Sequence, residues 1–231
     1  MHKSNIWCIP GVFFLAACVL NLISGIQGTA LADIVKPALL PLLSASCLAY
    51  LVGREYVDLF ATALLVTAQM FGGLGDALLL LNGFPFFLGG MVAFLVGHIF
   101  YMALFGGQSW RGLALWQWAI AIVVLAAALW GVMTQIGLDG DMFVPMLVYG
   151  FVLMLLIFSA LAGVLRMPKG KRATWWILLF GALLFACSDF CLAMSISGLM
   201  KFSLRHFLIM FTYLAAQSLL AVGGIRLILG K

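Results

Sequence analysis

Eight apolar stretches dominate the sequence, and each is about as long as a helix must be to cross a lipid bilayer. They are separated by clusters of Gly, Pro and charged residues and cover residues 6–25, 37–53, 58–82, 84–105, 113–135, 142–165, 173–198 and 206–228. About 20 mostly apolar helical residues span a hydrocarbon core of about 30 Å. With 66% apolar and 8% charged residues, the chain lacks the polar side chains that a water-exposed surface requires. The sequence therefore predicts an all-α polytopic membrane bundle of eight transmembrane helices, in which residues 1–231 form one domain with no soluble domain.

The basic residues are distributed unevenly between the two sides that eight spans would define. Excess Lys and Arg marks the cytoplasmic side of a membrane protein. If both termini lie on one side, that side carries nine basic residues and the other carries three. We therefore expect cytoplasmic termini, an inner-membrane location if the source is bacterial, and a net charge of +5 that reflects topology rather than a nucleic-acid partner. The nine are Lys3, Arg54, Arg111, Arg166, Lys169, Lys171, Arg172, Arg226 and Lys231, and the three are Lys36, Lys201 and Arg205.

Two aspartates lie inside apolar stretches, Asp76 within "GGLGDALLLLNG" and Asp189 within the seventh stretch. An ionised Asp near the bilayer centre costs about 2.5–3.5 kcal/mol on insertion scales, and neutralising an ordinary Asp at pH 7 costs about 4 kcal/mol. Because these costs are comparable, neighbouring groups must decide the protonation state of each acid. Asp76 is expected about six residues, or about 9 Å, and Asp189 about nine residues, or about 14 Å, from the outer ends of their helices. Intramembrane acids at similar depths predict a functional site.

Further polar residues fall at overlapping depths on several of the expected helices. Helical spacing places some of them on shared faces, and together they indicate one interior cavity. For an isolated Tyr, Gln or Asn, hydrogen bonding between helices is the alternative role. These residues are Asn21, Thr62, Gln69, His98, Tyr101, Tyr149, His206, Thr212, Tyr213 and Gln217.

A few cations stand at the outer side, where the acids are also expected. Lys36 precedes Pro37 at the expected start of the second helix, and Lys201, Arg205 and His206 flank the last turn. Such side chains can simply end helices and reach toward headgroups. Alternatively, Lys36 and Arg205 could hold the phosphate of a lipid whose chain lies among the apolar side chains.

Six short motifs occur in a recognisable order, and together they resemble the YhhN-like lysoplasmalogenase family. They are "KP" at 36–37, "GD" at 75–76, "GHIFY" at 97–101, "VYG" at 148–150, "SD" at 188–189 and "TYLAAQ" at 212–217. The resemblance implies an eight-helix intramembrane hydrolase acting on a lysophospholipid. It would cleave the vinyl ether bond of lysoplasmalogens, giving a fatty aldehyde and glycerophosphoethanolamine or glycerophosphocholine. The family's acids would correspond to Asp76 and Asp189, and its accompanying polar positions to Lys36, His98, Tyr101, Tyr149, Tyr213 and Gln217.

The chemistry of a vinyl ether agrees with that implication. Its hydrolysis begins with protonation at carbon and passes through an oxocarbenium ion that water captures. These reaction steps need an acid and a base but no metal or other cofactor. One protonated carboxyl and one ionised carboxylate can divide these roles, and the sequence leaves open which aspartate takes which.

Two other functions compete with this interpretation. A proton-coupled lipid or small-molecule transporter would also use paired membrane acids, although the sequence shows no clear inverted repeat. An intramembrane metallohydrolase would need a metal site built from His2, His98 and His206. Because His2 is expected at the opposite face from the other two, we expect no metal site.

Overall fold

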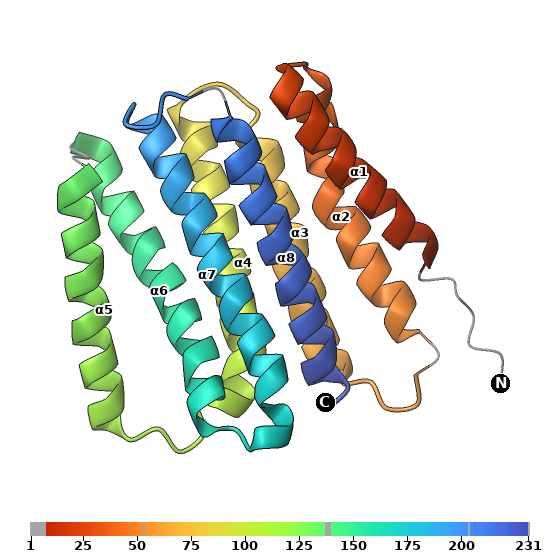
Figure 1. Ribbon diagram of the computed structural model, residues 1–231. Coiled ribbons are helices and arrows are strands. Elements are labelled where there is room, and N and C mark those ends of the chain that lie inside the picture. The colour runs from red at the N-terminus through yellow and green to blue at the C-terminus, as the bar shows by residue number, and fades with distance from the viewer. Residues whose placement is uncertain (1–7, 53, 137–139, 203, 231) are drawn as a thin grey trace.

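The computed structural model describes residues 8–230 except 53, 137–139 and 203, and over these residues it contains eight long α-helices and no strand (Figure 1). Each of the eight is long and apolar enough to cross a membrane, which confirms the predicted polytopic bundle. Two short 3-10 turns accompany them, η2 (Gly140–Met142) and η3 (Lys169–Lys171). The helices are α1 (Cys8–Gln27), α2 (Leu31–Leu51), α3 (Leu59–Leu78), α4 (Phe84–Ser109), α5 (Leu115–Ile136), α6 (Phe143–Arg166), α7 (Arg172–Ile196) and α8 (Arg205–Ile228).

Successive helices run in opposite directions, so α1 begins and α8 ends at the same end of the bundle (Figure 1). The α1–α2, α3–α4 and α7–α8 connections lie together at the other end, uppermost in Figure 1, which we call the upper end. It corresponds to the side that the sequence predicts to be outside. Which end faces the cytoplasm stays a prediction.

The helices differ in how deeply they are buried in the bundle. α5 and α1 lie at its two edges, whereas α3, α4, α7 and α8 occupy its middle (Figure 1). Within the most apolar stretch of each helix, 56% of α8 is buried but only 11% of α5. The inner helices therefore form the interior where costly polar side chains can find partners.

Glycine allows close helix packing and a tight turn at two positions. A Cβ on Gly163 of α6 would lie 1.9 Å from the Trp175 ring of α7, so only glycine fits against this indole. Gly83 has φ of 115°, which favours glycine and lets the chain reverse between α3 and α4. Both positions help to hold α3, α4, α6 and α7 in a compact group.

The predicted start of the second helix was wrong, because α2 begins at Leu31 and contains both Pro37 and Pro41. A proline removes only one backbone donor, and helices that pack inside a membrane protein tolerate it. Lys36 therefore lies within the second turn of α2 rather than at its entrance. Its side chain points into the bundle from a regular helix, as described below.

The third helix also ends earlier than expected, at Leu78 rather than residue 82. Turn hydrogen bonds at Leu80 and Leu81 replace the helical ones. Asp76 thus lies two residues before the last residue of α3, and Asp189 lies seven before the last residue of α7. Both acids occupy the upper part of their helices, as expected, but closer to the helix ends. All other helix limits agree with the prediction within four residues.

Candidate active site

Asp76 is sealed inside the bundle and carries its own counter-ion. Its carboxylate accepts a 2.7 Å hydrogen bond from the Tyr213 hydroxyl of α8. The Lys36 amine of α2 lies 3.5 Å from its other oxygen. Asp76 is 2% exposed and the Lys36 side chain 15% exposed. We call these three residues the Asp76 cluster, in which a negative charge is balanced by a partly buried cation and a hydroxyl donor.

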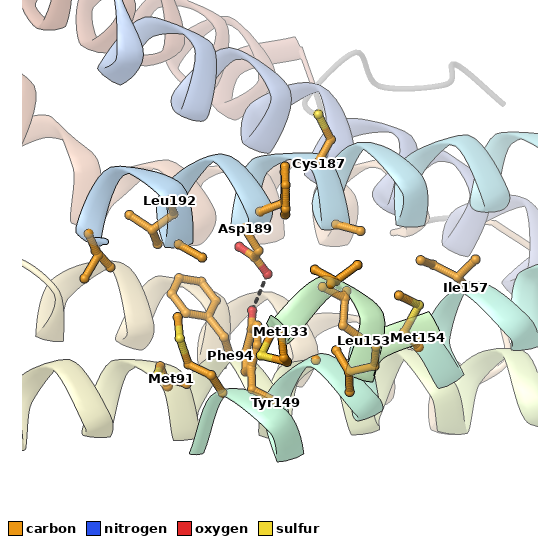
Figure 2. Close-up of a pocket in the computed structure, with 18 of the residues that line it drawn as sticks. Met91, Phe94, Met133, Tyr149, Leu153, Met154, Ile157, Cys187, Asp189 and Leu192 are labelled. Atoms are coloured by element: carbon orange, nitrogen blue, oxygen red, sulfur yellow. Dashed lines mark hydrogen bonds between the residues drawn. The ribbon is translucent and has the colours of Figure 1, made fainter. Parts of the chain in front are cut away.

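Asp189 has a different environment, between α7 and α6. Its carboxyl accepts a hydrogen bond from the Tyr149 hydroxyl of α6 (Figure 2). Among the described residues, no cation forms an ion pair with Asp189. Asp189 and Tyr149, which we call the Asp189 pair, line a cavity. This carboxyl therefore faces open space enclosed by apolar groups.

The cavity beside the Asp189 pair has a volume of about 400 Å³ and is lined by α4, α5, α6 and α7 together with Leu79. We call it the apolar cavity, because Asp189, Tyr149 and the Cys187 thiol are its only polar side chains among the described residues. Cys187 lies on its α7 wall (Figure 2). Leu183 and Phe190 also line it and are each 44% exposed, so the cavity reaches the lipid-facing surface of α7. Its shape and chemistry suit a hydrocarbon chain.

Two aromatic rings separate the apolar cavity from the Asp76 cluster. Phe94 of α4 lines the cavity, and its ring centroid lies 6.1 Å from that of Tyr213 and 6.3 Å from that of Phe185. The Phe185 ring in turn lies 5.5 Å from Tyr213. A Cβ on Gly75, the neighbour of Asp76, would lie 2.8 Å from the Phe94 ring. We call Phe94 and Phe185 the aromatic partition, since they stand between the two carboxyl centres.

His98 lies against this partition rather than beside either acid. Its ring is 1% exposed and packs 4.6 Å from Phe185 and 5.5 Å from Tyr149, measured between centroids. Neither ring nitrogen has a hydrogen-bond partner among the described residues. His98 thus packs between the Phe185 and Tyr149 rings with its hydrogen-bonding capacity unused.

Three more of the predicted polar residues, Gln69, Tyr101 and Gln217, join neighbouring helices, whereas Thr62 and Thr212 donate to backbone carbonyls three or four residues earlier. The Tyr101 hydroxyl donates to the Gln217 side-chain oxygen at 2.8 Å, and the Ser44 hydroxyl donates to Gln69 at 2.8 Å. The expectation of one polar interior cavity was wrong. These side chains satisfy one another across helix contacts, the alternative that apolar surroundings favour for uncharged polar groups.

Arg205 lines a second, polar cavity at the upper end, whose lining includes neither Asp76 nor Asp189. This cavity has a volume of about 710 Å³ and lies between the α1–α2 connection and the start of α8. Lys201 and His206 line it as well, whereas Lys36 is engaged with Asp76. Its lining residues are Gly25, Gly28, Thr29, Ala30, Ala32, Asp33, Lys201, Phe202, Arg205 and His206.

Sequence reasoning missed Phe94 and Asp33, for different reasons. Phe94 is one of 19 phenylalanines, and nothing local marks it as a wall between two acids. Asp33 stands three residues before Lys36 and could have been noticed as a polar neighbour on one helix face. The misplaced start of α2 left Asp33 in a loop, which removed that signal.

The histidines do not gather at one place in the part of the chain that the structure describes. His98 packs at the aromatic partition and His206 lines the polar cavity. No group of three or more metal-binding side chains occurs among the described residues. His2, the third histidine of the alternative metal site, lies outside them.

The fold and the two carboxyl centres define a polytopic helical membrane protein with a lipid-accessible cavity. The model of the YhhN family matches residues 31–224, and the chain belongs to that family. A curated human protein, Lysoplasmalogenase TMEM86B of Homo sapiens, is 32% identical over 166 residues. The match covers 71% of this chain and 65% of the human protein, so the chain spans slightly less than two thirds of that relative's length. No solved structure matches the chain significantly.

Proposed function

We propose that this protein is an intramembrane hydrolase that cleaves the vinyl ether bond of lysoplasmalogens. The products would be a fatty aldehyde and glycerophosphoethanolamine or glycerophosphocholine. Family membership and the name of the human relative support the substrate class. The observation that carries the proposal is the placement of the Asp189 pair in the wall of the apolar cavity.

The apolar cavity offers space for the hydrocarbon chain of a vinyl ether lipid and a carboxyl group beside that space. A hydrocarbon chain can lie between α5, α6 and α7, with its polar end at Asp189 (Figure 2). A carboxyl group that faces hydrocarbon is stabilised as the neutral acid, because no solvent or cation stabilises its charge. Asp189 is therefore the aspartate that we assign as proton donor.

The Asp76 cluster fits the complementary role. The Lys36 amine at 3.5 Å stabilises a negative charge on Asp76, and the Tyr213 hydroxyl adds a hydrogen bond. A carboxylate held negative can stabilise the cation that forms during the reaction and accept a proton from water. For both acids to reach one bond, the Phe94 side chain must turn away from Tyr213, and the vinyl ether must lie at the aromatic partition.

The proposed reaction balances with water as the only co-substrate. Asp189 gives its proton to the second carbon of the vinyl group, and the first carbon becomes an oxocarbenium ion. Water adds to that first carbon as Asp76 accepts a proton, which forms a hemiacetal. The bond between this carbon and the glycerol oxygen then breaks, and the oxygen takes a proton and leaves as the alcohol. Loss of the hydroxyl proton completes the aldehyde, and these last proton transfers restore Asp189 as the acid and Asp76 as the carboxylate.

The membrane orientation is part of the proposal. The nine-to-three distribution of basic residues supports cytoplasmic termini, which places the upper end, the two acids and both cavities toward the opposite side. In a bacterial source, this would be the periplasmic side of the inner membrane.

Aldehyde release is the direct test of the proposed activity. The full-length protein in lipid nanodiscs would be given 1-alkenyl lysophosphatidylethanolamine, and the aldehyde would be quantified by mass spectrometry. We expect release by the wild type and loss in Asp189→Asn. Asp141→Asn, which changes an exposed carboxyl of η2, is the matched control and should retain activity.

Two results would reject the proposal. Absence of aldehyde with the wild-type protein would rule out this activity for this substrate. Transfer of the intact lipid into vesicles without product would support the transporter hypothesis instead.

A further inference from the structure

We propose that the polar cavity at the upper end binds the phosphate of the substrate's glycerophospholipid headgroup, an inference that rests on the proposed function. Lys201 and Arg205 supply two cations to the cavity wall, and Asp33 supplies one acid. With His206 neutral, the wall carries a net positive charge, which favours an anion. Asp33 can receive the ammonium group of ethanolamine or choline beside the phosphate.

One residue that lines the polar cavity, His206, has a ring nitrogen without a hydrogen-bond partner among the described residues. The Nε2 atom of His206 is buried and has no hydrogen-bond partner among the described residues. A Cβ on Gly25 would lie 2.2 Å from the His206 ring, so glycine in α1 makes room for it. If the His206 ring turned from Gly25 toward the cavity, a phosphate oxygen could accept a hydrogen bond from its Nε2–H group, which would satisfy this nitrogen.

Arg205 stands at the first position of α8, where the positive end of the helix dipole adds to the attraction for an anion. Arginine can also bind two phosphate oxygens at once. The cavity lies at the end of the membrane-spanning helices, at the level where phospholipid headgroups reside. The position of the polar cavity, its net positive charge and its hydrogen-bond donors therefore all suit the binding of a headgroup phosphate.

The cavity lies at a suitable distance from the proposed chemistry. Six bonds separate the phosphorus from the first vinyl carbon of a lysoplasmalogen, about 7 Å when extended. Asp33 lines the polar cavity, and Lys36, which contacts Asp76, follows three residues later, about 4.5 Å farther down the same helix. A headgroup in the polar cavity would thus place the vinyl ether near the level of Lys36 and Asp76, with its chain directed toward the aromatic partition and the apolar cavity.

Binding of a lipid that cannot react separates this inference from the proposed activity. The probe is 1-O-alkyl lysophosphatidylethanolamine, a saturated ether without the vinyl group, bound to the full-length protein in nanodiscs. We expect the double variant Lys201→Gln, Arg205→Gln to raise its Kd at least tenfold, and Arg205→Lys to raise it less. The control double variant Lys169→Gln, Lys171→Gln, at the lower end, should bind like the wild type. A thermal melt of each variant checks that it is folded.

A second probe without phosphate tests which group is recognised. Binding of 1-O-alkylglycerol should be equal in the wild type and the double variant, and glycerophosphoethanolamine should displace the phospholipid probe from the wild type. Unchanged binding of the phospholipid by the double variant would overturn the inference. Loss of inorganic phosphate binding alone, with lipid binding retained, would assign the cavity to free phosphate and also overturn it. Because both probes are unreactive, these outcomes stand even if the wild type releases no aldehyde.

Discussion

The two aspartates of this protein occupy environments of opposite character. Asp76 is sealed among α2, α3 and α8 with a lysine and a tyrosine as partners. Asp189 opens into a hydrocarbon-lined cavity with a tyrosine as its hydrogen-bond partner. The same side chain is thus held beside a positive charge in one place and beside apolar groups in the other. Paired-carboxylate hydrolases separate acid from base by the same kind of contrast.

The contrast also shows why a polar residue in a membrane protein must be interpreted through its partners. Asp76, Tyr101 and Gln217 are all buried and hydrogen-bonded. None of these three lines the apolar cavity, whereas Asp189 does. Burial of a polar side chain therefore indicates only that it requires a hydrogen-bond partner. Exposure to a cavity indicates which of these side chains can contact a substrate.

The largest effect is expected from a substitution of Asp189, the acid that lines the apolar cavity. Asp189→Asn keeps the size of the side chain and can still accept the Tyr149 hydrogen bond, but it cannot donate the catalytic proton. We expect kcat for aldehyde release to fall about 10²- to 10⁴-fold, with little change in Tm. Activity within tenfold of the wild type would contradict the assignment of Asp189 as the acid.

Removing the sealed charge should affect stability as well as activity. Asp76→Asn leaves the Lys36 ammonium, 15% exposed, without its carboxylate, which should cost about 1–3 kcal/mol. Adding Lys36→Met should recover much of that stability but not the activity. Thermal unfolding in detergent and aldehyde release, measured over all four forms of this cycle, test the prediction. Recovery of activity in the double variant would show that Asp76 serves only as a structural partner of Lys36.

The tyrosine partners of the two acids, Tyr149 and Tyr213, test whether one acid mainly supports catalysis and the other mainly stability. Tyr149→Phe removes the hydrogen bond to Asp189 at the cavity, and we expect kcat to fall about tenfold. Tyr213→Phe removes a donor from the sealed Asp76, and we expect a stability loss of about 1–3 kcal/mol. Measurements of kcat and Tm for both variants would show whether Tyr149→Phe lowers mainly kcat and Tyr213→Phe mainly Tm. Identical profiles for the two variants would argue that the two centres act as one.

The smallest effect is expected at the lipid-facing wall of the apolar cavity. Cys187 is exposed and lines this wall, so Cys187→Trp should obstruct the cavity without unfolding the protein. We expect KM to rise several-fold for long-chain substrates and to change less for short-chain ones, because only a long chain needs the full cavity. Cys187→Ala is the control. Equal KM changes for both chain lengths would show that the chain lies elsewhere.

The sequence predicted the bundle because apolar length is the dominant physical requirement of a membrane span. It also selected Asp76 and Asp189 as candidate site residues, since an acid inside a membrane span is costly and therefore predicts a functional role. It could not pair Lys36 with Asp76, because the expected helix start at Pro37 placed that lysine at the surface. The separation of the two acids depends on where Phe94 packs, and one apolar ring among many carries no sequence signal for that role.

The two cavities near the upper end differ sharply in polarity, and this difference bears on how products would leave. The proposed reaction divides one amphiphile into an oily aldehyde and an ionic glycerophosphate ester. The oily product would form beside a wall that reaches the lipid phase at Leu183 and Phe190, and the ionic product beside a charged opening at the membrane surface. Each would partition into the phase that dissolves it, so hydrolysis itself would drive both products away from the centre where they form.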